Sequence, residues 1–253
     1  MTDKLTNDFI SIRSKKDRGV VFTDPRIAEK MSALLPENPG VVIDYCAGTG
    51  KLLASVKNAE KKIAIEIDPD IAEYCKTNTD QIEVIVGDCF SHNIKADNAV
   101  LNPPYANDKY GGRNELEFIL HVLNNLNPGG YLSVIVPMSS GISSKKKEIE
   151  LRTEILKQHQ ILEIHTMRSD IFDYVTVNTI ILLIRAHTPN SEPTKMFTGE
   201  HETEALLGSE DECCAEAYLN PDYSTITYKT FLSSIKEQLM NEIAVKVDQV
   251  LGE

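Results

Sequence analysis

The first 185 residues alternate short apolar runs with longer amphipathic stretches, a pattern that predicts an α/β domain. Short apolar runs bounded by glycine, proline or polar residues are typical of buried strands. We expect seven strands, at Val41–Tyr45, Lys62–Glu66, Ile82–Val86, Asn98–Leu101, Tyr131–Val136, Ile161–His165 and Val177–Ile184. Helices are expected around them, at Pro25–Leu35, Lys51–Lys57, Asp70–Asn78, Asn114–Leu126 and Lys145–His159.

Strands that are apolar throughout and alternate with helices predict a mostly parallel sheet with helices on both faces. No helical pattern separates the last two predicted strands, so we expect them to form an antiparallel hairpin at the end of the sheet. The predicted fold is therefore a Rossmann-like α/β domain with a seven-stranded sheet, and we place it at residues 1–186.

A second segment follows, at residues 187–253, where the composition becomes acidic. Near its end an apolar stripe with helical spacing predicts an amphipathic helix, formed by Phe231, Leu232, Ile235, Leu239, Ile243 and Val247. This helix either docks on the preceding domain or forms a dimer or partner interface.

Composition indicates the cellular compartment in which we expect the protein. Five cysteines without a CxxC pair, in a chain of 253 residues, favour reduced thiols and a cytoplasmic location. The N-terminal residues have no apolar core of signal-peptide length, and no apolar run approaches the roughly 18 residues of a membrane span. We therefore expect a soluble intracellular protein without a membrane association.

The net charge of −12 is unevenly distributed along the chain. The first 185 residues carry 25 acids and 22 bases, whereas the remaining residues carry 13 acids and 4 bases. Nucleic-acid binding requires a basic footprint, so activity on DNA or RNA would need local basic clusters or a basic partner. Two clusters are present, Lys109 with Arg113 and Lys145–Lys147, and each is either a solvated helix face or a phosphate contact.

A glycine loop follows the first predicted strand, with the sequence Asp44-Tyr45-Cys46-Ala47-Gly48-Thr49-Gly50. Glycines at 48 and 50 allow a tight turn and a close approach of the backbone to a ligand. The third glycine of the dinucleotide fingerprint and the Lys-Ser pair of a phosphate loop are both missing. Asp44 beside the loop instead suits a ligand that carries an ammonium and a sulfonium group.

Acidic residues also end the next two predicted strands. Glu66, about 20 residues after the loop, could accept hydrogen bonds from both hydroxyls of a ribose. Ile67 could pack against an adenine face, and Asp88, followed by Cys89, could accept from an adenine amino group. Three acids at successive strand ends, where open α/β sheets bind ligands, favour a nucleoside site.

The fourth strand is followed by Asn102-Pro103-Pro104-Tyr105. The two prolines fix two φ angles and make the loop rigid. The Asn102 amide oxygen and the Pro103 carbonyl could accept both protons of one amino group, which would free its nitrogen lone pair. Tyr105 offers a planar face on which a ring can stack. The loop therefore predicts chemistry at an amino nitrogen.

With these features together, residues 19–185 resemble the S-adenosylmethionine-dependent N6-adenine DNA methyltransferases. The segment from Gly19 to Pro25 is similar to their N-terminal cofactor motif. The order of motifs resembles the gamma arrangement of type I modification subunits.

The resemblance implies S-adenosylmethionine as cofactor and no metal. It implies that the cofactor is bound by Phe22, Thr23, Asp44, Cys46, Ala47, Gly48, Thr49, Gly50, Glu66, Ile67, Asp88, Cys89 and Asn102. Catalysis is implied at Asn102, Pro103, Pro104 and Tyr105, with Phe172 covering the other face of an extruded adenine; a core position for Phe172 is the alternative.

Two departures from the family pattern stand out. Asp24 is inserted between the threonine and the proline of the N-terminal motif, and no segment after Arg185 looks like a target-recognition domain. The N-terminal motif and Phe172 favour adenine in DNA as the substrate. Because no recognition domain is evident, we expect a separate specificity or DNA-binding subunit as partner. Glutamine N5-methyltransferases acting on proteins and some RNA adenine methyltransferases share the same loop chemistry, and a non-catalytic scaffold subunit is a further alternative.

Overall fold

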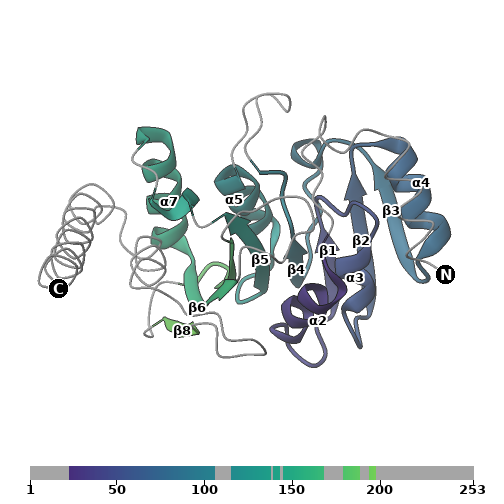
Figure 1. Cartoon of the computed structure of the whole chain (residues 1–253), viewed down its shortest axis with the longest axis horizontal. Helices are drawn as coiled ribbons and strands as arrows, with labels where there is room; N and C mark the ends of the chain where they lie inside the picture. Colours follow the sequence, from purple (N-terminus) through teal and green to yellow (C-terminus); the bar gives the residue numbers. More distant parts are fainter. Residues whose placement is uncertain are drawn as a thin grey trace, which may run out of the picture.

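The computed structural model describes residues 23–105, 115–137, 139–142, 145–167, 179–188 and 194–197. Its strands form one sheet (Figure 1) in the order β3-β2-β1-β4-β5-β7-β6-β8. The strands are β1 (Val41–Asp44), β2 (Lys61–Glu66), β3 (Ile82–Val86), β4 (Asn98–Leu101), β5 (Tyr131–Pro137), β6 (Gln160–Met167), β7 (Thr179–Arg185) and β8 (Lys195–Phe197). The helices are α2 (Pro25–Ala33), α3 (Lys51–Ser55), α4 (Pro69–Asn78), α5 (Glu115–Asn125), α6 (Ser139–Ile142) and α7 (Lys146–Gln158), with a 3-10 turn η2 at Cys89–Ser91.

The pairing of the strands confirms the predicted fold class. Strands β1 to β5 pair in parallel, and β7 is antiparallel to both β5 and β6. The seven predicted strands are all present, with bounds within one or two residues of those expected. The structure adds an eighth, β8, which pairs in parallel with β6 and lies beyond residue 186, the predicted end of the domain.

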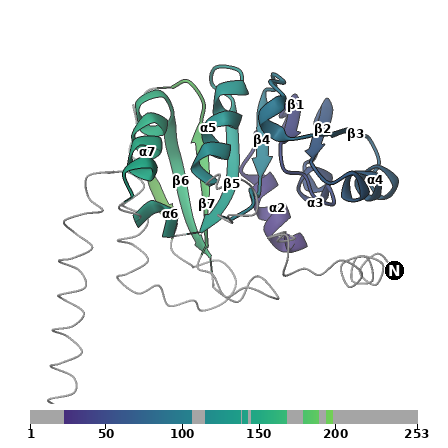
Figure 2. The same ribbon diagram turned by 90° about the horizontal axis from the view of Figure 1, so that it is seen from above.

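Helices cover both faces of the sheet, as the uniformly apolar strands predict. On one face α5 and α7 pack over a cluster that includes Ile43 and Leu101. On the other face α2, α3 and α4 pack over a cluster that includes Val42 and Val100. Figure 2 shows the strands side by side, with α4 next to β3 at one end of the sheet and α7 next to β6 towards the other.

Helices α2 and α4 begin with the same capping sequence, an aspartate followed by a proline. Asp24 caps α2 through the Arg26 N–H at 2.8 Å, and Pro25 is its first helical residue. Asp68 caps α4 in the same way, ahead of Pro69. An aspartate before a proline is favourable here because the carboxylate accepts otherwise unpaired N–H groups and proline has none to lose. The Asp24 insertion is thus the N-cap of α2.

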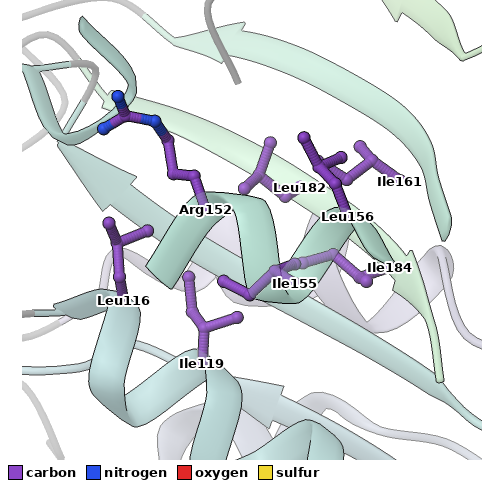
Figure 3. A pocket seen from close by; sticks show the side chains of 8 residues that line it. All are labelled: Leu116, Ile119, Arg152, Ile155, Leu156, Ile161, Leu182 and Ile184. Carbon is purple, nitrogen blue, oxygen red and sulfur yellow. The ribbon is translucent and has the colours of Figure 1, made fainter. Parts of the chain in front are cut away.

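A small apolar cavity lies between α5, α7 and the hairpin strands β6 and β7 (Figure 3). Its lining is Leu116, Ile119, Arg152, Ile155, Leu156, Ile161, Leu182 and Ile184. The guanidinium group of Arg152 is turned away from the apolar side chains. It donates to the Ser140 carbonyl at 2.8 Å and so ties α7 to the short helix α6.

The strand order places a topological switch point between β1 and β4. From β1 the chain builds outward through β2 to β3, and then returns to β4 on the other side of β1. The loops that leave β1 and β4 therefore diverge, and open α/β sheets bind ligands in the resulting crevice at the carboxyl ends of the strands.

The predicted C-terminal helix lies outside the described residues, and the boundary at residue 186 stays a prediction. Among the helices that the structure describes, none has the length and apolarity needed to cross a membrane.

Candidate functional site

The glycine loop after β1 is held as a tight turn against the neighbouring strand. The Ala47 N–H donates to the Ile65 carbonyl of β2 at 2.9 Å, and the Gly50 N–H donates to the Ala47 carbonyl at 2.8 Å. Gly48 and Gly50 have φ values of 54° and 79°, which are strained for other residues. A Cβ at Gly50 would lie 2.5 Å from the Cys75 sulfur, whereas a Cβ at Gly48 would meet no atom within 4 Å. Gly50 is thus needed for packing, while the space beside Gly48 is open to a ligand.

Glu66, at the end of β2, braces this loop. Its Oε2 accepts the Gly48 N–H at 2.8 Å, and its Oε1 accepts the Asp68 N–H at 2.9 Å. Burial raises the pKa of the Glu66 carboxyl, and the backbone hydrogen bonds from Asp68 and Gly48 oppose that rise. A carboxylate oxygen can accept two hydrogen bonds, so capacity remains for a ribose. The sequence motif did not reveal the bracing role, since it depends on which loop lies beside β2.

Asp44, at the end of β1, is fully buried. Its Oδ1 accepts the Cys46 N–H at 2.9 Å, while its Oδ2 has no hydrogen-bond partner among the described residues. Burial raises the pKa of Asp44 to about 7; the Cys46 hydrogen bond lowers it and the nearby Glu66 carboxylate raises it. A buried carboxylate oxygen without a partner is costly. This oxygen therefore indicates a site that awaits a cation or a hydrogen-bond donor.

The residues predicted to contact a nucleoside lie at the adjacent strand ends. Ile67 exposes 57% of its side chain, which is unusual for an isoleucine beside a buried site and fits packing against a ring. Asp88 caps the turn η2 through the Phe90 N–H at 3.1 Å. The neighbouring Cys89 side chain, together with burial, raises the pKa of the Cys46 thiol.

Asn102, directly after β4, meets the N-terminal motif. Its Nδ2 donates to Oγ1 of Thr23 at 3.0 Å, across 79 positions of sequence. Thr23 is 7% exposed. This bond directs the amide nitrogen of Asn102 towards Thr23, so the amide oxygen faces away from the threonine. The two predicted motifs are therefore in direct contact at the switch point.

The remainder of the loop is compact. Pro103 is buried and Pro104 is half-buried. Burial, with the Glu115 carboxylate as a smaller contribution, raises the pKa of Tyr105 and keeps its phenol neutral. A neutral aromatic ring at the end of this loop suits stacking on a base.

Not every predicted site residue can be placed. Phe22 and Phe172, like Lys109 and Arg113, lie outside the described residues. The second basic cluster is described, and each of its lysines has an acidic partner. Lys147 pairs with Glu117 at 3.0 Å, and Lys145 and Lys146 pair with Glu148 and Glu150 of their own helix at 3.3 and 3.9 Å. These pairs favour a solvated helix face over a phosphate contact.

The edge of the sheet at the switch point, and not the cavity of Figure 3, has the chemistry of a binding site. Apart from Arg152, which is turned away, that cavity is lined by apolar side chains. The carboxyl ends of β1, β2 and β4 carry the Asp44 oxygen, the open space at Gly48, the exposed Ile67 and the Asn102 amide. These groups fit a nucleoside linked to a cationic chain, beside an amide positioned to bind an amino group. No group of three metal-binding side chains occurs in the part of the chain that the structure describes.

Comparison with known proteins agrees with this arrangement. A family model described as N-6 DNA Methylase matches residues 5–206. The type II restriction enzyme and methyltransferase RM.BcgI of Heyndrickxia coagulans is 28% identical over 209 residues, which are 69% of this chain and 32% of that protein. The chain thus spans about a third of the length of the curated relative it matches.

Solved structures share the fold at low sequence identity. The type I restriction-modification system methyltransferase subunit from Streptococcus thermophilus superposes with a TM-score of 0.62 at 13% identity, covering 79% of this chain and 53% of that one. The EcoKI M protein of a type I restriction enzyme superposes with a TM-score of 0.58 at 18% identity, covering 75% and 51%.

Proposed function

The chain belongs to the N-6 DNA methylase family, and on that premise we propose that it transfers a methyl group from S-adenosylmethionine to the N6 amino group of adenine in DNA. The observation that carries the proposal is the contact between Asn102 and Thr23. It places the amide of the Asn-Pro-Pro-Tyr loop at the edge of the crevice that suits the cofactor. A nucleoside site alone would fit many reactions, whereas this amide selects a reaction at an amino nitrogen.

In this proposal the acids of the crevice bind the cofactor. Oδ2 of Asp44 binds the cationic part of the methionine moiety, and the exposed Ile67 packs against the adenine ring. Glu66 keeps Gly48 in position through its Oε2 and uses its remaining lone pairs for the ribose. When bound, S-adenosylmethionine supplies an electrophilic methyl group on a sulfonium centre.

Asn102 and Pro103 prepare the nucleophile. The amide oxygen of Asn102 and the carbonyl of Pro103 accept hydrogen bonds from the two N–H groups of the adenine N6. The nitrogen lone pair is thereby withdrawn from the ring and becomes available for attack. With the cofactor bound, this lone pair would form the new N–C bond as the S–C bond to the sulfonium breaks, and the methylated nitrogen would release one proton to solvent. Acceptors fixed in advance stabilise the developing positive charge without reorganisation. Tyr105 stacks on the adenine, which must leave the duplex to reach this loop.

We also propose that a separate subunit supplies DNA recognition. The EcoKI M protein is itself named as part of a type I restriction enzyme. The present chain carries a net charge of −12, and the described lysines of the second basic cluster, Lys145–Lys147, are paired with glutamates. Sequence-selective binding would therefore depend on a basic partner.

The substrate is tested by tritiated methyl transfer from S-adenosylmethionine to DNA, RNA and protein, followed by digestion to nucleosides and peptides. We expect the label in N6-methyladenine from DNA. Label in RNA adenine would identify an RNA enzyme, and label in glutamine would identify a protein N5-methyltransferase. Cofactor binding without transfer to any of the three would favour a scaffold subunit.

A further inference from the structure

Thr23 occupies a junction between the two motifs of the site. Its Oγ1 accepts the Nδ2 proton of Asn102 at 3.0 Å, and its side chain is 7% exposed. Thr23 directly precedes Asp24, which caps α2, and Pro25 begins the helix. The helix cap therefore fixes the backbone on which the Thr23 hydroxyl is carried.

The hydroxyl of Thr23 has one proton that this contact does not use. A threonine hydroxyl provides one donor and two acceptor lone pairs, and the bond from Asn102 occupies a lone pair. No acceptor for the Thr23 proton is recorded within the described residues. The proton is therefore available to a ligand in the crevice, where the same residue already touches Asn102.

The direction of the hydrogen bond matters because a carboxamide has two different ends. With Nδ2 towards Thr23, the amide oxygen of Asn102 faces the other way and can accept from an amino group. With the amide reversed, its NH₂ group would meet the NH₂ group of the target base, and two donors would oppose each other. A free hydroxyl tolerates both orientations, because it can either accept or donate. A hydroxyl whose proton is already donated can only accept, so it selects the productive orientation.

We propose that Thr23 is a positioning residue that donates its proton to the carboxylate of the bound methionine moiety and thereby holds the Asn102 amide with its oxygen towards the target base. The proposal rests on the proposed methyltransferase function and adds a dependence within it: cofactor binding orients the amide that activates the substrate. Cofactor and target sites are thus coupled through one side chain.

Three variants test the coupling by single-turnover methylation at saturating cofactor. Thr23→Val keeps the shape and removes the hydroxyl, Thr23→Ser keeps the hydroxyl, and Thr153→Val is a matched control. Thr153 donates to the Ile149 carbonyl of its own helix at 2.7 Å, far along the sequence from the site. We expect Thr23→Val to raise the cofactor dissociation constant and also to slow the saturated rate about five- to tenfold, the loss typical of one hydrogen bond. Thr23→Ser and Thr153→Val should stay within about twofold of wild type on the same scale.

A second measurement needs no DNA. The side-chain NH₂ resonances of Asn102 can be identified in ¹⁵N-labelled protein by their absence in Asn102→Asp. We expect S-adenosylhomocysteine, which keeps the carboxylate, to slow exchange of these protons with water in wild type and Thr23→Ser. In Thr23→Val, saturated with the same ligand, the exchange should stay fast.

Two results would overturn the inference. One is a Thr23→Val chain with a raised dissociation constant but a wild-type saturated rate, which would make Thr23 a cofactor contact alone. The other is an Asn102 NH₂ exchange rate that responds equally in wild type and Thr23→Val. Failure of the proposed function would give a different result. A wild-type chain that shows the NH₂ response but makes no N6-methyladenine would support the role of Thr23 and exclude adenine in DNA as the substrate.

Discussion

At the scale of single residues, the site depends on carboxylates that accept hydrogen bonds from the backbone and keep further hydrogen-bonding capacity for a ligand. Asp44 accepts one backbone N–H and keeps a buried oxygen without a partner in the described structure. Glu66 accepts two backbone N–H groups. The type and position of these residues could be read from the sequence. Their bonds to the backbone could not, because they depend on which loops the sheet brings together.

Asn102→Ala should remove turnover and leave cofactor binding nearly intact. The amide oxygen acts only on the target amino group, so its loss affects the transition state and not the methyl donor. Removing one donor or acceptor that meets developing charge typically costs about 10²–10³ in rate. Titration calorimetry and single-turnover methylation measure the two effects separately. A rate within about threefold of wild type, far short of that loss, would exclude Asn102 from the chemistry.

The pKa of Asp44, raised to about 7, predicts a pH-dependent cofactor affinity. Below pH 7 the empty site holds this carboxyl protonated, and a cation is bound well only after the proton leaves. The dissociation constant should therefore fall as the pH rises from 5.5 to 7, by at most about tenfold per pH unit. Calorimetry in buffers of different ionisation enthalpy should detect proton release in this range. The matched variant Asp44→Asn should bind weakly and without this pH dependence, and the same slope in that variant would assign the proton to another group.

The same shift predicts the stability of the empty protein. A carboxyl with a raised folded pKa favours the folded state at acidic pH, and this contribution is lost as the pH rises from the ordinary value of 3.8 through about 7. Asp44→Asn should therefore be more stable than wild type at pH 8, by on the order of 1–3 kcal/mol, and closer to it at pH 5.5. Urea unfolding at both pH values measures the difference. An equal difference at the two would contradict a buried, titrating Asp44.

At the scale of elements, the hydrophobic pattern predicted the helices and strands that have a clear local pattern, but not those that depend on contacts with distant residues. Helices and strands with clear periodicity or apolar runs were found within a few residues. The three-residue strand β8 was not predicted, because a strand this short has no period and exists through its pairing with β6. The short helix α6 was missed for a similar reason, since it depends in part on the bond from Arg152 to the Ser140 carbonyl.

The two glycines of the loop should respond differently to alanine. Gly50→Ala combines a left-handed φ with a Cβ 2.5 Å from the Cys75 sulfur, whereas Gly48→Ala has the left-handed φ alone. The left-handed conformation costs about 1–2 kcal/mol, and the overlap at Gly50 adds about 1–3 kcal/mol. Urea unfolding should therefore show the larger loss for Gly50→Ala. Adding Cys75→Ala should recover part of that loss and none of the loss from Gly48→Ala; equal losses in the two glycine variants would contradict this packing.

At the scale of the whole molecule, an acidic chain is proposed to act on a polyanionic substrate. The net charge is −12, and Lys145, Lys146 and Lys147 each pair with a glutamate. The sequence predicted this imbalance directly from composition. The pairing of Lys147 with Glu117 could be seen only in the structure, because it joins α7 to α5.

The isolated chain should therefore hold duplex DNA weakly and without sequence preference. Non-specific binding by competent proteins has dissociation constants of about 10⁻⁴–10⁻⁶ M at physiological salt, and this chain should lie at or beyond the weak end. Fluorescence anisotropy on random and genomic duplexes tests this expectation. Sequence-selective binding at about 10⁻⁸ M or tighter would place the recognition surface within this chain and remove the need for a partner.

The identity of the methylated atom distinguishes the proposed reaction from its alternatives. Duplex DNA is incubated at high concentration with the chain and S-adenosylmethionine carrying a deuterated methyl group, digested to nucleosides and analysed by mass spectrometry, with Asn102→Ala in parallel. We expect deuterated N6-methyladenine with wild type and a yield at least about 10²-fold lower with the variant at equal time. The deuterated methyl group on cytosine in place of adenine would contradict the proposed reaction. Equal yields of N6-methyladenine from both proteins would contradict the role of Asn102.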